Sequence, residues 1–308
     1  MNAFATHLLD GLNATHGQPG QLWFDAGPGG LPFIHVHNAH AQACISLYGG
    51  QVLSFRPHAH TDLLFLSEQA VYQLGKAIRG GVPLCWPWFG PDPQALGRPN
   101  HGFARTRLWS LLATGHTPNG ETHITLGLTD EPDTRTLWPH AFELTLNITL
   151  GATLELVLTT RNTGTAPFDI TQALHSYFAV SDSAQATVTG LDGCTYIDNA
   201  TGAHGVLRQQ AGGVRFEGEV DRIYTGAPAE LALQDRAGQR TLSIASTGSQ
   251  TAVVWNPGAA VAARMADLPS GGERHFVCVE TANAANEVVT VAPGGEHRLM
   301  ASIGLAMP

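Results

Sequence analysis

Polar and apolar side chains alternate strictly over residues 143–150, and this pattern limits the possible folds more than any other feature. Because successive side chains of a strand point to opposite faces, the alternation predicts a strand with one buried face. Residues 154–160 follow after Gly151 and Ala152, and the two segments predict a β-hairpin. Comparable runs occur at residues 123–128, 241–246, 251–255, 275–280, 287–291 and 298–305.

Clusters of turn-forming residues separate the predicted strands. They lie at residues 163–164, 212–213, 270–272 and 293–295. Helical periodicity is confined to two short segments, residues 3–12 and 67–74. Many short strands with almost no helix predict an all-β fold, a large antiparallel β-sandwich with a few short helices. No linker or repeat interrupts the pattern, so we expect a single domain over residues 1–308.

Charge is scarce in this chain, and its balance excludes several functions. Charged residues make up 13% of the 308 residues, and the net charge is −9. This acidic balance, without a basic stripe, argues against binding to nucleic acid. No apolar stretch approaches the roughly 18 residues of a membrane span, so we expect no membrane partner. Lys76 is the only lysine, and any Schiff-base chemistry would have to use it.

The N-terminal residues and the cysteines indicate a cytoplasmic protein. Residues 1–10 lack the basic end, apolar run and cleavage site of a signal peptide. The cysteines are widely spaced and form no C-x-x-C pair, which predicts buried free thiols. They are Cys44, Cys85, Cys194 and Cys278. We expect a monomer, because nothing in the sequence demands a partner chain.

A histidine-rich segment, residues 35–60, is the first candidate site. His35 and His37 would share one face of a strand and could ligate zinc. Three more histidines follow at His40, His58 and His60. No cysteine or carboxylate cluster completes a metal-binding set. We therefore interpret these histidines as solvated or packing residues, and we expect neither a metal nor a cofactor.

Three further segments could carry chemistry. Residues 79–91 are rich in glycine, proline and tryptophan, which is typical of a binding loop or of a loop that caps the core. His175 lies in an apolar segment, where a lone histidine is more often a packed core residue than a catalyst. Glu280 ends an apolar strand, and because buried carboxylates are rare unless paired, it is either functional or salt-bridged.

Six motifs, taken together and in order, make the chain resemble a known family. They are residues 79–83 with a Trp-Pro-x-Phe-Gly continuation, 101–105, 174–178, 220–224, 254–257 and 279–280. Over residues 20–305 the chain resembles the glucose-6-phosphate 1-epimerases, which are hexose-6-phosphate mutarotases of the aldose 1-epimerase superfamily. The resemblance implies a galactose mutarotase-like β-sandwich, in agreement with the strand pattern.

The resemblance also implies roles for individual residues. His175 matches the catalytic acid of the family, and Glu280 matches its catalytic base. The substrate-binding residues that it implies are Arg79, Asn100, His101, Arg105 and Asp221. The arginines would hold the substrate and its phosphate, and the aspartate would be an acidic ligand. Asn100 stands where the family often has glutamine, so its contact would be shortened or made through water.

These residue types suit the interconversion of α and β anomers. Opening a hemiacetal ring requires a base at the C1 hydroxyl and an acid at the ring oxygen. The ordinary carboxyl pKa of about 4.3 leads us to expect an ionised Glu280 at neutral pH. The imidazole of His175 can hold and release a proton near pH 7. Arginine presents a planar fork to a phosphate, so we expect a small phosphorylated sugar as the partner.

Three alternative functions remain open from the residues alone. An epimerase of free aldoses would have no use for two arginines in its cleft. A non-catalytic carbohydrate-binding module would not need an acid matched with a base. A glycoside hydrolase usually needs two carboxylates beside the scissile bond. The motifs together favour an epimerase of a hexose 6-phosphate, with glucose 6-phosphate as the first candidate.

Overall fold

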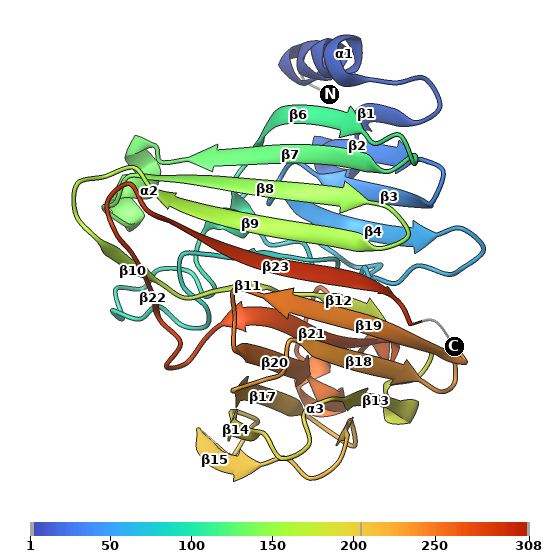
Figure 1. The fold of residues 1–308 in the computed structure, drawn as a ribbon, viewed down its shortest axis with the longest axis vertical. Helices are drawn as coiled ribbons and strands as arrows, with labels where there is room; N and C mark the ends of the chain where they lie inside the picture. Colours follow the sequence, from blue (N-terminus) through green and yellow to red (C-terminus); the bar gives the residue numbers. More distant parts are fainter. Residues whose placement is uncertain (1–2, 204, 307–308) are drawn as a thin grey trace.

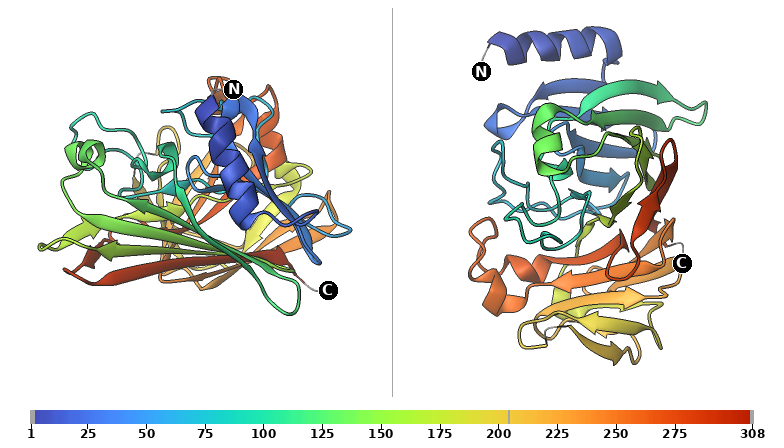
Figure 2. Two further views of the ribbon diagram at one scale, coloured as in Figure 1. Left: turned by 90° about the horizontal axis from the view of Figure 1, so that it is seen from above. Right: turned by 90° about the vertical axis from the view of Figure 1, so that its left-hand side faces the viewer.

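Antiparallel strand pairing dominates the computed structural model, which describes residues 3–203 and 205–306 (Figure 1). Nearly all strands belong to a nine-stranded sheet, an eight-stranded sheet and a four-stranded sheet. The prediction of an all-β antiparallel sandwich is therefore confirmed. The nine-stranded sheet extends down most of the long axis of the molecule, with the four-stranded sheet behind its upper part and the eight-stranded sheet behind its lower part (Figures 1 and 2).

The nine-stranded sheet contains most of the strands predicted from alternation. Its order is β16 (Val214–Arg215), β13 (Ala186–Thr189), β18 (Glu230–Asp235), β19 (Arg240–Thr247), β23 (Glu296–Leu305), β9 (Leu154–Asn162), β8 (Phe142–Leu150), β7 (Thr122–Thr129) and β6 (Ser110–His116). Strands β8 and β9 form the predicted hairpin, in which Leu150 pairs with Leu154. Every strand predicted for this sheet is present to within a few residues.

The eight-stranded sheet carries the residues that matter for function. Its order is β15 (Val206–Gln209), β14 (Thr195–Asp198), β17 (Val220–Thr225), β20 (Thr251–Asn256), β21 (Phe276–Asn283), β11 (Gln172–Leu174) and β5 (Leu84–Cys85). Strand β12 (Tyr177–Ala179) also pairs with β21, beyond the end of β11. Two strands on one side of β21 are therefore separated by a short interruption at residues 175–176.

The remaining strands form two smaller sheets. The four-stranded sheet has the order β1 (Leu22–Ala26), β2 (Pro32–His37), β3 (Ala41–Ser46) and β4 (Gln51–Pro57). The two-stranded sheet pairs β10 (Phe168–Ile170) with β22 (Val289–Val291). The predicted strand at residues 287–291 is confirmed, but in a shorter form.

Helices are few and short, as expected. They are α1 (Ala3–His16), α2 (Pro132–Leu137) and α3 (Gly258–Ala262), with 3-10 turns η1 (Pro28–Gly30), η2 (Ala104–Thr106), η3 (Ser183–Gln185) and η4 (Gly272–His275). Helix α1 lies at one end of the molecule (Figure 2), where the Asn13 side chain exchanges two hydrogen bonds with the Phe24 backbone. No helix in residues 3–203 and 205–306 is long and apolar enough to cross a membrane.

The helix predicted over residues 67–74 is wrong. The segment forms turns, and the backbone N–H and the hydroxyl of Ser67 at its start bond to other parts of the chain. The Ser67 N–H donates to the Arg79 carbonyl at 3.1 Å, and the Ser67 hydroxyl donates to the Asp267 carbonyl at 2.7 Å. These tertiary contacts replace the local bonds that a helix would need.

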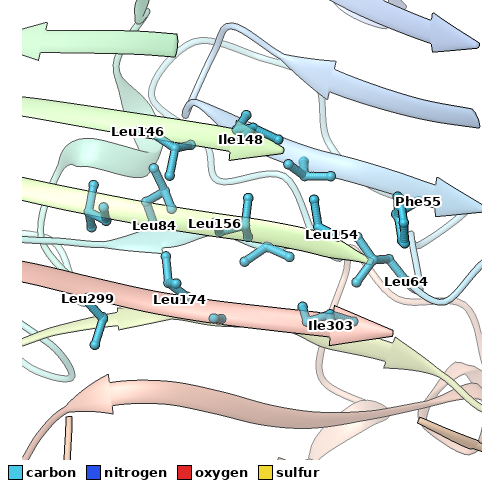
Figure 3. Packing of buried hydrophobic residues seen from close by; sticks show 14 of the residues in the cluster. Phe55, Leu64, Leu84, Leu146, Ile148, Leu154, Leu156, Leu174, Leu299 and Ile303 are labelled. Carbon is cyan, nitrogen blue, oxygen red and sulfur yellow. The ribbon is translucent and has the colours of Figure 1, made fainter. Parts of the chain in front are cut away.

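Buried aliphatic side chains fill the space between the sheets (Figure 3). Leu146, Leu156 and Ile303 from the nine-stranded sheet lie in one cluster with Leu84 and Leu174 from the eight-stranded sheet. The same cluster extends from Leu9 to Ile303, which supports the single domain that we predict over residues 1–308.

The four cysteines are free, but only two of them are buried. Cys85 and Cys278 are inaccessible, as predicted. Cys44 and Cys194 are half-buried, so the prediction of a buried thiol is wrong for them. Cys44 alternates with the core residues Ala43 and Ile45 along β3, which places its side chain on the opposite face of the strand.

We expect Leu156→Ala to reduce the free energy of unfolding by about 2–5 kcal/mol, because it removes a fully buried side chain from the core and leaves a cavity. Leu207→Ala is the matched control on a strand, since Leu207 is 68% exposed, and it should change stability by less than about 0.5 kcal/mol. Urea denaturation measures both. Equal losses in the two variants would contradict the packing described here.

Candidate active site

One face of the eight-stranded sheet packs in the core, and the other face lines a cavity of about 470 Å³. Along β20, Ala252 and Val254 belong to the main core, whereas Val253 and Trp255 line the cavity. The same alternation places Val279 of β21 in the core and Glu280 at the cavity. The period of two in the sequence therefore divides each strand between a structural face and a functional face.

Strand register brings the cavity residues of three strands side by side. Asp221 of β17 pairs with Trp255 of β20, and Val253 of β20 pairs with Glu280 of β21. Paired residues of antiparallel strands point to the same face, so these side chains form one floor. Two carboxylates that lie 59 positions apart in the chain thus share one cavity.

All seven residues predicted as catalytic or substrate-binding line this cavity. They come from two loops, the interruption between β11 and β12, and strands β17 and β21: Arg79, Asn100, His101, Arg105, His175, Asp221 and Glu280. Motifs that span about two hundred positions of the sequence therefore converge on one place, which supports the roles predicted for them.

His175 lies in the interruption between β11 and β12. Its backbone N–H donates to the Pro83 carbonyl at 3.0 Å, and the Ser176 carbonyl accepts from Val279 N–H at 3.3 Å. Its ring stacks on Tyr177, with centroids 4.8 Å apart and an angle of 7° between the planes. The break in the strand, together with this stacking, holds the imidazole against the cavity, so His175 is not merely a packed core histidine.

His175 and Glu280 form a buried pair. The Nε2 atom of His175 lies 3.4 Å from Oε1 of Glu280. The two residues are only 7% and 2% exposed. Their other polar atoms, His175 Nδ1 and Glu280 Oε2, have no hydrogen-bond partner within the described part of the chain. Buried polar atoms normally have a partner, so these two are available to a ligand in the cavity.

The environment shifts both pKa values of the pair toward the neutral forms. Burial raises the pKa of Glu280 well above its usual range, and the Asp221 carboxylate adds to this shift. Burial lowers the pKa of His175 well below its usual range, with further repulsion from His101 and Arg105. The expectation of an ionised Glu280 rested on the ordinary carboxyl pKa, and burial shifts that pKa toward the neutral form.

These opposite shifts both favour the uncharged pair, a carboxylic acid beside a neutral imidazole. A carboxylic acid beside a neutral imidazole contains the same number of protons as a carboxylate beside an imidazolium. A ligand that donates hydrogen bonds to the carboxylate would favour the ionised form and move the proton toward His175. The pair is thus suited to proton transfer without exchange with solvent.

His101 is a neutral hydrogen-bond donor at the cavity. Burial and the charges of Arg105 and Arg79 lower the pKa of His101 to about 3. Its Nδ1 accepts from the Gly90 N–H at 3.2 Å, which places the ring proton on Nε2. Nε2–H can therefore donate to a hydroxyl group, in agreement with the binding role predicted for this residue.

Arg79 is held by two residues that the sequence analysis did not identify as site residues. Its Nε and Nη2 atoms both lie 3.1 Å from Oδ2 of Asp267, and its Nη1 donates to the Tyr177 hydroxyl at 2.9 Å. Asp267 thereby offsets the charge of Arg79, and two of its N–H groups remain for a ligand. Because Tyr177 stacks on His175, this network also fixes the imidazole ring of His175.

Arg105 belongs to a loop that also carries Asn100. Its Nη2 donates to the Asn100 carbonyl at 2.9 Å, which orders the loop at the cavity. No carboxylate within the described residues forms an ion pair with Arg105, in contrast to Arg79. Arg105 therefore keeps its positive charge available.

Four cavity residues with polar side-chain atoms were not predicted as site residues, namely Lys76, Tyr177, Trp255 and Asp267. Tyr177 and Trp255 lie inside the motifs at residues 174–178 and 254–257, so their positions could have been inferred. Lys76 lies three residues before Arg79, and the sequence analysis considered it only as a possible amine for Schiff-base chemistry. Asp267 lies outside every motif, and no sequence pattern indicated it.

The histidine-rich segment lies elsewhere, on the four-stranded sheet. His35 contacts Asp25 at 2.9 Å and stacks on Trp23, and the rings of His37 and His58 are 5.6 Å apart. In the part of the chain that the structure describes, no three His, Cys, Asp or Glu residues are placed to hold a metal ion. The segment does not contribute to the cavity.

Comparisons with known proteins agree with this geometry. The profile of the aldose 1-epimerase family matches residues 32–303. A protein of Cenchrus ciliaris, provisionally named a glucose-6-phosphate 1-epimerase, is 37% identical over 280 residues, which cover 88% of this chain and 84% of the relative. The crystal structure of a protein from Salmonella typhimurium, described provisionally as a mutarotase, has a TM-score of 0.87 and 33% identity over 98% of this chain and 100% of its own.

A more distant structure bears on the fold alone. The galactose mutarotase-like protein of Clostridium acetobutylicum has a TM-score of 0.72 at 12% identity, over 94% of this chain and 99% of its own. The predicted galactose mutarotase-like sandwich is therefore confirmed.

We expect Asp221→Asn to stabilise the protein at pH 7.5 by about 1–2 kcal/mol. Burial and the nearby Glu219 and Asp198 raise the pKa of Asp221 to about 6, from an ordinary 3.8. A raised carboxyl pKa means that folding favours the protonated form, so stability is lost as the pH rises from 3.8 through 6. Denaturation without sugar measures this, and the advantage of the variant should grow between pH 5 and pH 7.5. A variant that is less stable at pH 7.5 would contradict this electrostatic account.

Proposed function

The chain belongs to the aldose 1-epimerase family, and from this premise we propose that it interconverts the α and β anomers of a hexose 6-phosphate, with glucose 6-phosphate as the first candidate. The observation that carries the proposal is the buried pair of His175 and Glu280 in a cavity that also contains Arg79 and Arg105. The pair suits ring opening, and the arginines suit an anionic substituent.

Glu280 acts as the base, and His175 acts as the acid. The sugar C1 hydroxyl lies against the free Oε2 of Glu280, where it donates a hydrogen bond. This bond favours the carboxylate form, and the proton of the pair then resides on His175. Glu280 removes the C1 hydroxyl proton while His175 protonates the ring oxygen, and the ring opens to the aldehyde.

Ring closure uses the same two residues in reversed roles. After rotation about the C1–C2 bond, His175 removes the proton from the C5 hydroxyl as its oxygen attacks C1. Glu280 returns a proton to the oxygen on C1. The pair again holds one proton at the end of the cycle, so no exchange with solvent is required.

The other cavity residues hold and orient the sugar. Arg79 and Arg105 donate to phosphate or ring oxygens, and arginine can do so in a bidentate manner. Asp221 accepts from a sugar hydroxyl, His101 donates to one, and Asn100 contacts the substrate directly or through water. A neutral aldose would leave the cationic groups without an anionic partner, and this is the reason for preferring a phosphorylated sugar.

The wild-type protein should accelerate anomerisation of glucose 6-phosphate at least tenfold more, in kcat/KM, than that of glucose. Charge-assisted hydrogen bonds to the phosphate provide this difference. Exchange NMR or polarimetry on both sugars measures it, after the spontaneous rate has been subtracted. Equal acceleration of the two sugars would reject the phosphate preference but not the epimerase chemistry.

Glu280→Gln and His175→Asn should each lower kcat for glucose 6-phosphate by about 100-fold or more, because each removes one partner of the proton transfer. Glu296→Gln, which changes an exposed carboxylate on β23, is the matched control and should retain full activity. Circular dichroism verifies that each variant is folded. Near-normal turnover in either folded site variant would refute the acid–base assignment.

A further inference from the structure

We propose that Lys76 is a phosphate ligand and determines the preference for a phosphorylated over a neutral sugar. The inference rests on the proposed function and deepens it, because it concerns the same cavity. No motif and no acid–base step above involves this residue. Lys76 lines the cavity, as Arg79 does, and it follows directly after the turn at residues 73–75.

The backbone at Lys76 is held firmly while its side chain is free. The hydroxyl of the buried Tyr48 donates to the Lys76 carbonyl at 3.0 Å, and the Lys76 N–H donates to the Gln73 carbonyl at 3.0 Å. The side chain is exposed at the cavity and forms no ion pair within the described residues. Lys76 therefore lines the cavity from a backbone that two hydrogen bonds hold in place.

The charge balance of the cavity favours this assignment. Three cationic side chains line it, namely Lys76, Arg79 and Arg105. Arg79 is already paired with Asp267, at 3.1 Å, so much of its charge is offset. A phosphate dianion needs more positive charge than one guanidinium supplies. Lys76 and Arg105 are the two cations of the cavity that are not offset by a carboxylate in the described structure.

The amino-acid usage of the chain is an independent argument. Arginine occupies fifteen of the sixteen basic positions, and the single lysine stands at this cavity. The two side chains differ in shape, because lysine carries a compact ammonium on a flexible stem and arginine a rigid planar fork. A phosphate on the exocyclic C6 can rotate during ring opening, and a flexible point charge can follow it. A chain that otherwise uses arginine thus has lysine where flexibility is useful.

Lys76→Met should lower kcat/KM for glucose 6-phosphate by about tenfold or more, mainly through KM, while glucose turnover stays within twofold. Lys76→Arg keeps the positive charge, and its kcat/KM for glucose 6-phosphate should fall less than that of Lys76→Met. Arg236→Met removes an exposed cation on the turn after β18 and controls for the change in net charge. An unchanged sugar preference in Lys76→Met, or equal losses for both sugars, would overturn the assignment.

The sugar preference of the wild-type protein distinguishes a failure of this inference from a failure of the proposed function. If wild-type protein does not prefer glucose 6-phosphate, the proposed function is wrong, and with it the role of Lys76. If wild-type protein prefers glucose 6-phosphate and Lys76→Met keeps that preference, only the role of Lys76 is wrong.

A second measurement uses unmodified protein. Because the chain has one lysine, acylation by an amine-reactive ester followed by peptide mass spectrometry reports on Lys76 specifically. Glucose 6-phosphate and inorganic phosphate should both slow the acylation, whereas glucose should not. Equal protection by all three, or protection by none, would contradict contact between Lys76 and the phosphate.

Discussion

The burial of the Glu280 carboxylate on β21 is the constraint on which the chemistry of the cavity depends. All eight residues of this strand are buried, so the carboxylate lies where its charge is poorly solvated. A charge in such a place must be neutralised or paired. His175 provides the partner, with its Nε2 atom 3.4 Å from Oε1 of Glu280. Desolvation thus shifts the pKa values of two ordinary ionisable residues toward their uncharged forms.

The sheet and the loops supply different parts of the site. Strands β17 and β21 contribute the carboxylates Asp221 and Glu280, whose positions are set by register. Loops contribute the cationic residues Lys76, Arg79 and Arg105. Strands hold reacting groups rigidly, whereas loops can adapt to the substituents of a substrate.

Much of the fold could be predicted because it depends on local patterns. The hairpin of β8 and β9 follows from alternation and a short turn, and both are visible within twenty residues of sequence. The false helix at residues 67–74 shows the limit of this approach. The Ser67 N–H donates to the Arg79 carbonyl, and the Ser67 hydroxyl donates to the Asp267 carbonyl. Neither partner lies within the local pattern that predicted the helix.

By itself, the sequence determined which face of each strand is apolar and, through the order of six motifs, which seven residues to consider. These are properties of residue type and short spacing. The tertiary structure alone decided that Glu280 is desolvated, that Asp267 offsets Arg79, and that the single lysine lies at the same cavity. The reason is physical. Desolvation and charge pairing depend on distance in space, and the groups concerned lie up to about two hundred positions apart along the chain.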